Sequence, residues 1–172
     1  LAMTDPLTGL HNRRYAMAHL SRIAERAAVA GRTFALMILD LDRFKAINDT
    51  HGHAAGDAVL AEVAARLSAQ LRPADLAARI RGEEFLVVLP DTGLVDACAV
   101  AERLRRAVGD RSVALPHGRG AISVTSSIGL AIGNSAATRL MEVDDLIHSA
   151  DMALLAAKLE GRNQVTIGQT AA

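Results

Sequence analysis

The chain has 172 residues, half of them apolar, and this length is enough to bury one core, so a single domain over residues 1–172 is expected. Its 19 basic and 19 acidic residues balance, which excludes the strongly basic surface that marks binding to nucleic acid or to an anionic membrane. The single cysteine, Cys98, excludes an internal disulfide and a cysteine zinc cluster, and it fits a reducing cytoplasm.

The first half of the chain predicts a helix, a buried strand and a second long helix. Residues 11–31 have a helical spacing of apolar residues that ends at a glycine. A continuous apolar run predicts a buried strand over residues 33–40. The next residues are polar through Gly52, and a helix is expected to start at Gly56–Asp57 and to end at Pro73.

The second half predicts a hairpin followed by alternating helices and strands. Two short apolar stretches, 76–80 and 85–89, flank a tight turn at residues 81–84. The remaining elements expected are helices over 93–108 and 143–159, and strands over 122–132 and 164–167. This order predicts an α+β fold: a mostly antiparallel central sheet with a ferredoxin-like βαββαβ core, an additional N-terminal helix, and the helices on one face.

Acidic residues occur where two apolar elements of this sheet end. Asp40 and Asp42 close the first strand, where side chains two residues apart point to one face, and Glu83 and Glu84 lie in the hairpin turn. Exposed turns are often acidic, so any one of these residues is equally well explained by solvation. Both pairs together favour a magnesium site, since Mg²⁺ prefers oxygen ligands and combines one or two carboxylates with phosphate groups.

Four motifs in order give the chain a resemblance to a known family. Arg81-Gly82-Glu83-Glu84-Phe85 resembles the GG(D/E)EF signature of diguanylate cyclases. The segments 40–53, 5–14 and 157–163 resemble the motif that precedes this signature and the opening and closing motifs of the family. The resemblance covers nearly the whole chain and implies a nucleotidyl-cyclase palm that joins two GTP molecules into cyclic di-GMP.

The resemblance implies a metal site and a set of catalytic residues. Mg²⁺ or Mn²⁺ would be held by Asp40, the backbone carbonyl of Leu41, and Glu83, with Glu84 beside them. One of the two turn acids would accept the proton of the 3′-hydroxyl group. Lys45 would stabilise the charge that develops on the phosphate groups.

The resemblance also assigns the residues that bind the substrate. Asn48 and Asp57 match the guanine-binding pair, and a carboxylate suits guanine because N1–H and the 2-amino group donate to it together, whereas adenine lacks that pair of donors. Without the resemblance, Asp57 is better explained as an acid at a helix start, where the dipole favours it. The other substrate contacts that the family implies are Phe44, His53, Lys158 and Arg162.

A second site and two partners follow from the resemblance. Arg72 and Asp75 form the R-x-x-D pair at which the product inhibits this family, and Arg103 matches a third contact. Because one chain offers one nucleotide site, catalysis implies a homodimer. The chain has no apolar run long enough to span a membrane and begins almost at once with a motif, so we expect a cytoplasmic domain of a longer signalling protein, and this leaves open a membrane anchor in the rest of that protein.

One departure from the family pattern keeps other functions open. Arg81 stands where the signature has its first glycine, and arginine tolerates positive φ poorly. A domain impaired in this way would be a regulatory module that binds GTP or cyclic di-GMP, and a cyclase of different base specificity is a third possibility. The opening motif residues Asp5, Asn12 and Arg14 are expected to be structural.

Overall fold

The computed structural model describes residues 2–168 and has one main sheet of six strands in the order β1-β3-β4-β2-β7-β8. These strands are β1 (His11–Asn12), β2 (Phe34–Leu41), β3 (Leu76–Arg81), β4 (Glu84–Leu89), β7 (Ser126–Gly133) and β8 (Val165–Ile167). The central pairs are antiparallel, while β1 lies parallel to β3 and β8 lies parallel to β7. The predicted α+β fold with a mostly antiparallel sheet is therefore confirmed.

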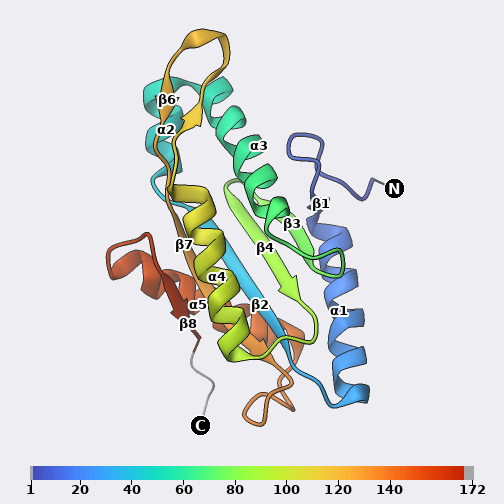
Figure 1. Ribbon diagram of the computed structural model, residues 1–172. Coiled ribbons are helices and arrows are strands. Elements are labelled where there is room, and N and C mark those ends of the chain that lie inside the picture. The colour runs from blue at the N-terminus through green and yellow to red at the C-terminus, as the bar shows by residue number, and fades with distance from the viewer. Residues whose placement is uncertain (1, 169–172) are drawn as a thin grey trace.

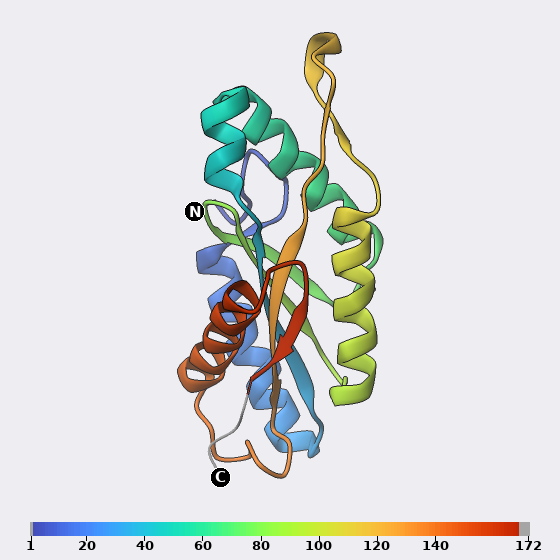
Figure 2. The same ribbon diagram turned by 90° about the vertical axis from the view of Figure 1, so that its left-hand side faces the viewer.

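The helices cover both faces of the sheet, which corrects the expectation of a single covered face. They are α1 (Arg13–Ala30), α2 (Phe44–His51), α3 (His53–Ala69), α4 (Leu94–Gly109) and α5 (Val143–Leu159). Figure 2 shows α1 and α5 on one side of the sheet and α4 on the other. Every residue of β2 is buried, because its side chains point alternately into two apolar layers.

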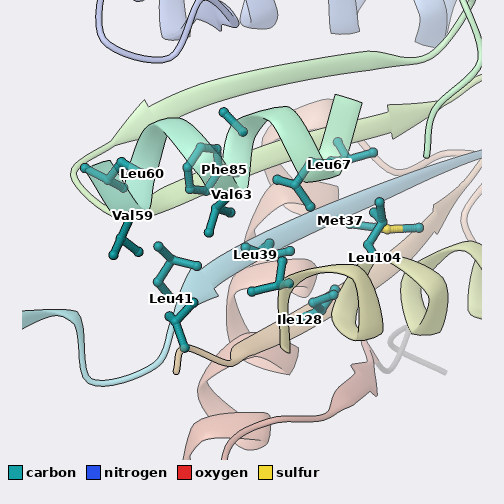
Figure 3. Close-up of a cluster of buried hydrophobic side chains, with 14 of the residues drawn as sticks. Met37, Leu39, Leu41, Val59, Leu60, Val63, Leu67, Phe85, Leu104 and Ile128 are labelled. Atoms are coloured by element: carbon teal, nitrogen blue, oxygen red, sulfur yellow. The ribbon is translucent and has the colours of Figure 1, made fainter. Parts of the chain in front are cut away.

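The larger core lies under α3 and α4 (Figure 3). Leu39 of β2, Phe85 of β4 and Ile128 of β7 pack there against Val63 of α3 and Leu104 of α4. Aliphatic side chains fill most of this layer, as the scarcity of aromatic residues predicts. The second core joins the opposite face of the same strands to α1 and α5.

Several element boundaries differ from the prediction. The polar segment that ends at Gly52, for which no helix was predicted, forms α2, and α3 begins at His53, before Gly56, and ends at Ala69, before Pro73. The strand expected over 122–132 is divided between β7 and a short separate pair, β5 (Val113–Ala114) and β6 (Ala121–Ile122). The β5–β6 arm extends beyond the end of the sheet near α2 (Figures 1 and 2).

The end of β2, the β3–β4 turn and α2 lie at the same end of the molecule (Figure 1). The predicted hairpin is present, and its turn is only Gly82 and Glu83. Among residues 2–168, no helix has both the length and the apolar character needed to cross a membrane.

Candidate active site

The acids at the end of β2 and in the hairpin turn meet because β2 and β4 pair directly. Asp40 stands opposite Glu84 in the antiparallel register, and the backbone N–H of Leu41 donates to the carbonyl oxygen of Glu83 at 3.2 Å. Two segments more than 40 residues apart in the sequence are thereby held side by side by backbone hydrogen bonds. The expectation that Asp40 and Glu83 come together is met.

A lysine from α5 completes this cluster. The Nζ atom of Lys158 donates to Oδ2 of Asp40 at 2.6 Å, and the Asp40 side chain is almost fully buried. Burial raises the pKa of Asp40, and the charges of Glu83 and Asp42 raise it further, while Lys158 lowers it. The cluster therefore holds more negative charge than its one lysine balances, which favours the approach of a further cation.

The hairpin turn accommodates Arg81 without backbone strain. Gly82 alone in this turn has a positive φ, of +33°, while Arg81 is the last residue of β3. The Nε atom of Arg81 lies 3.5 Å from Oε1 of Glu84, too far and too poorly aligned for a hydrogen bond. Burial raises the pKa of Glu84, which Arg81 opposes and the nearby Asp151 and Asp40 reinforce.

Asp42 has a structural role and is not a free ligand. Its carboxylate accepts hydrogen bonds from the hydroxyl groups of Thr125 and Ser127, at 2.7 and 2.6 Å, and from the backbone N–H of Asn163 at 3.0 Å. These bonds join the end of β2 to the start of β7 and to the loop after α5. Because the loop follows Lys158 closely, Asp42 helps to position that lysine.

The predicted guanine-binding residues lie on the neighbouring helices α2 and α3. Asn48 is on α2 and contacts Gly56 of α3 so closely that a Cβ atom on Gly56 would lie 1.8 Å from Oδ1 of Asn48. Asp57 follows Gly56 and is exposed. Oδ1 of Asn48 is buried against Gly56 and has no hydrogen-bond partner in the described part of the chain.

The other predicted substrate residues on α2 and α3 differ in how far they are exposed. Phe44 is buried in the larger core and supports the start of α2, and His53 is exposed at the start of α3. The Lys45 side chain is 92% exposed and pairs with Asp49 on its own helix at 3.2 Å. Lys45 is thus not paired with the acid cluster in this structure.

Arg162 lies at a cavity of about 540 Å³ between α2, residues 121–125 and the loop at 161–163. Arg162 and Arg43 both line this cavity, and both have a positive φ, of 65° and 55°. Asp42 also lines this cavity, whereas Asp40, Glu83 and Glu84 do not. Arg162 therefore lies beside the acid cluster but faces a different cavity.

The two residues of the predicted inhibitory pair, Arg72 and Asp75, form a salt bridge with each other. The Arg72 guanidinium donates to Asp75 at 2.8 Å and also to the carbonyl oxygen of Pro90 at 3.1 Å. The Asp75 side chain is only 3% exposed, whereas that of Arg72 is 57% exposed. Arg103 donates to the carbonyl oxygen of Gln70 at 3.0 Å and thus lies near the same surface. Arg72 therefore presents its free edge to solvent while Asp75 fixes its orientation.

Sequence reasoning missed one residue that supports the site. Arg79 of β3 donates to the carbonyl oxygen of Gly82 at 2.7 Å and contacts Asp5 at 3.3 Å. Asp5 in turn accepts from the backbone and hydroxyl groups of Thr8, and Asn12 caps α1 by accepting from Tyr15. The opening motif therefore braces the hairpin turn, which agrees with its expected structural role.

The residues at this end of the sheet fit a divalent cation that also binds phosphate groups. Among residues 2–168 no three His, Cys, Asp or Glu side chains surround a common metal-sized position. Mg²⁺ needs fewer protein ligands when phosphate oxygens and water complete its shell. Asp40, the Leu41 carbonyl and Glu83 supply oxygen atoms, and Oε1 of Glu84, which has no hydrogen bond but lies 3.5 Å from Nε of Arg81, is another nearby. The donor chemistry therefore suits magnesium or manganese.

A mixed sheet with helices on both faces and acids at one end defines a cyclase-like α+β domain. The family model described as "Diguanylate cyclase, GGDEF domain" matches residues 2–164. The chain belongs to this GGDEF diguanylate cyclase family.

Individual relatives agree with this assignment. The chain is 44% identical over 171 residues to Response regulator PleD of Caulobacter vibrioides, covering 99% of this chain and 37% of that protein. It is 40% identical to Diguanylate cyclase A of Treponema denticola, covering 98% of this chain and 45% of that protein. The chain thus spans less than half the length of these relatives.

Solved structures extend the comparison to the fold. The GGDEF domain of DgcB from Caulobacter crescentus, solved in complex with c-di-GMP, has a TM-score of 0.91 and 34% identity, over 97% of this chain and 93% of that one. Diguanylate cyclase SiaD from Pseudomonas aeruginosa, solved with its activator SiaC, has a TM-score of 0.88 and 41% identity, over 97% of this chain and 62% of that one.

Proposed function

We propose that the chain is the catalytic domain of a diguanylate cyclase, a single domain over residues 1–172 that acts as a homodimer. Each of two bound GTP molecules attacks the α-phosphorus of the other through its 3′-hydroxyl oxygen. Two phosphodiester bonds form, two α–β phosphoanhydride bonds break, and two pyrophosphates leave with cyclic di-GMP. One carboxylate of each turn, Glu83 or Glu84, accepts the proton of the hydroxyl group.

The meeting of Asp40 with Glu83 and Glu84 beside Lys158 is the observation that carries this proposal. Phosphoryl transfer needs positioning and charge stabilisation more than covalent chemistry by the protein. Asp40, Leu41 and Glu83 would hold Mg²⁺ or Mn²⁺, which when bound polarises phosphate oxygens. Lys158 and Arg162 would bind phosphate groups, and Lys45 would contact them after leaving its exposed pair with Asp49.

Asn48 and Asp57 support guanine as the base. Asn48 packs closely on Gly56, the residue before Asp57, which limits where its amide can lie. Phe44 and His53 would border the same pocket. A site with fixed polar partners discriminates strongly because the wrong base leaves them unpaired. Efficient turnover of ATP would contradict this part of the proposal.

Replacement of Gly56 by Ala is expected to raise the KM for GTP about 10-fold, with little loss of stability. The new methyl group would collide with Oδ1 of Asn48 and displace the amide, while alanine itself favours the helix. Steady-state kinetics with GTP measure the effect. Gly109→Ala is the matched control, because its Cβ atom would meet its nearest neighbours at 3.6 and 3.7 Å. An unchanged KM in Gly56→Ala would argue against Asn48 as a base contact.

Incubation of the chain with GTP and Mg²⁺, followed by chromatography of the nucleotides, tests the proposed function directly. Formation of cyclic di-GMP and pyrophosphate is expected. The assay should use a concentrated sample or a fusion that forces dimerisation, since one chain binds one substrate. Tight GTP binding without product under these conditions would contradict catalysis.

A regulatory module that binds GTP or cyclic di-GMP is the second candidate. The proximity of Arg81 to Glu84 favours it, because a guanidinium at 3.5 Å partly neutralises a carboxylate that catalysis would use. Arg81→Gly distinguishes the candidates. A large gain of turnover in this variant over an inactive wild-type chain would identify Arg81 as the impairing residue.

Product inhibition is expected to depend on Arg72. We infer that cyclic di-GMP binds the exposed edge of the Arg72 guanidinium, with Arg103 as a further contact, and that Asp75 acts by holding Arg72 in place unless the pair opens. Arg72→Ala should raise the cyclic di-GMP concentration needed for half-maximal inhibition at least about 10-fold, since a charge-assisted contact is lost. Arg106→Ala, an exposed arginine on α4, serves as the control. Equal inhibition of Arg72→Ala and wild-type enzyme would refute the assignment.

A further inference from the structure

A groove of about 780 Å³ runs between α1 and α5, on the face of the sheet away from α3 and α4. Its floor is apolar and consists of half-buried side chains that pack on the second core: Met17, Ala24, Met141, Val143 and Ile147. Figure 2 shows the two helices on the same side of the sheet. The floor is thus an apolar surface that the described residues cover only in part.

The groove is bordered by acids. Glu25 of α1, Glu142 at the N-cap of α5, and Asp144 and Asp151 of α5 line it, against Arg13 and His148. None of these six residues takes part in a salt bridge with any residue between 2 and 168. In a chain with equal numbers of acids and bases, this surface has a local excess of unpaired negative charge.

Helix-end preferences explain only part of this acidity. Glu142 and Asp144 lie at the N-terminus of α5, where the helix dipole favours acids. Asp151 is in the middle of α5, and Glu25 is in the C-terminal half of α1, where the dipole favours bases. The helix dipole therefore does not account for the acids at these two positions.

The α1 wall leaves room for another helix. Ser21, Ala24 and Ala28 follow each other at intervals of three or four residues on the wall of the groove, and small side chains let a neighbouring backbone approach closely. Between Arg13 and Ala28 the wall is about 22 Å long at the helical rise per residue. This length matches about four turns of a docked helix.

We propose that the groove between α1 and α5 binds an amphipathic helix of a partner protein, with apolar residues on the groove floor and lysine or arginine residues against Glu25, Asp144 and Asp151. The helix-in-groove mode needs both features, an apolar floor and charge of the opposite sign at the edges. The two methionines of the floor adapt to different apolar side chains.

Charge argues against two other occupants. A second copy of the chain on a two-fold axis would place the acidic surface against itself, and like charges repel. An anionic membrane would be repelled for the same reason.

The groove lies close to the candidate active site, since the charge of Asp151 on its wall helps to raise the pKa of Glu84. The docking proposal concerns binding alone and is independent of whether the chain makes cyclic di-GMP.

A designed peptide of about 18 residues tests the proposal. It carries leucine on one helical face and lysine on the other, and its binding is measured by fluorescence anisotropy. A peptide of the same composition, shuffled so that it has no apolar face, is the peptide control. Glu25→Lys and Ile147→Glu alter the edge and the floor, and Asp96→Lys makes the same kind of charge change on exposed α4.

The amphipathic peptide should bind at least about 10-fold more tightly than the shuffled one, with the affinity falling at higher salt. Glu25→Lys and Ile147→Glu should each weaken it at least about 10-fold, whereas Asp96→Lys should not. Glu25 is exposed, so its variant keeps the test valid if Ile147→Glu fails to fold. Equal binding of both peptides, insensitivity to both groove variants, or self-association of the chain through this groove would overturn the proposal.

Discussion

Replacing Asp40 by Asn, or Glu83 by Gln, is expected to reduce the formation of cyclic di-GMP from GTP at least about 100-fold. Each change removes one negative charge from the cluster that would bind the metal ion, and a metal supplies several kcal/mol of charge stabilisation in such reactions. In Asp40→Asn the remaining amide also loses its ion pair with Lys158, at 2.6 Å in the wild-type chain. Product is measured by chromatography over a range of Mg²⁺ concentrations.

Two controls separate chemistry from folding. Asp96→Asn removes a negative charge on exposed α4, and Glu160→Gln removes one just beyond α5 near the site; neither should change turnover more than about two-fold. Thermal unfolding shows whether Asp40→Asn is folded, since Asp40 is buried and lies opposite Glu84 in the sheet. Turnover close to that of the wild-type chain in either active-site variant would remove Asp40 and Glu83 from the proposed metal site.

The part of this site that could be predicted from sequence is the part that local patterns encode. The apolar run before Asp40 and the two short strands around residues 81–84 specify where strands end, and acids at strand ends are visible in the sequence. Backbone pairing then brings Asp40 opposite Glu84. The continuous apolar run also indicates that both faces of β2 are buried, and two buried faces require helices on both sides of the sheet, as the structure has them.

What the sequence did not reveal depends on contacts between distant segments. α2 has eight residues and buries only Phe44 and Ile47, which is too short a periodic signal to distinguish it from a polar loop. Asp42 appeared equivalent to Asp40, yet its partners Thr125 and Ser127 are more than 80 residues away. No local pattern identifies such a partner.

A buried arginine on α3, Arg66, is expected to contribute strongly to the stability of the fold, although its sequence pattern does not indicate this. Glu62 and Arg66 are four residues apart on α3, a spacing typical of an exposed ion pair. In the structure the Arg66 side chain is only 5% exposed. Its guanidinium donates to the carbonyl oxygens of Val108, Arg111 and Ser112 at 2.8 to 2.9 Å. Arg66 thereby satisfies carbonyl groups at and after the end of α4 that have no partner within that helix.

Replacement of Arg66 by Met is therefore expected to lower the free energy of unfolding by about 3 kcal/mol. Methionine retains much of the apolar stem, so the loss reports the hydrogen bonds and the charge near the C-terminus of α4. Urea unfolding at constant m-value measures the change, and the melting temperature should fall by about 6–12 °C. Arg106→Met is the matched control: Arg106 is exposed, pairs with Glu102 at 3.3 Å, and should contribute less than about 1 kcal/mol. If Arg66→Met were as stable as Arg106→Met, the carbonyl groups at the end of α4 would be satisfied by water at no cost, and the bridge from α3 to α4 would not stabilise the fold.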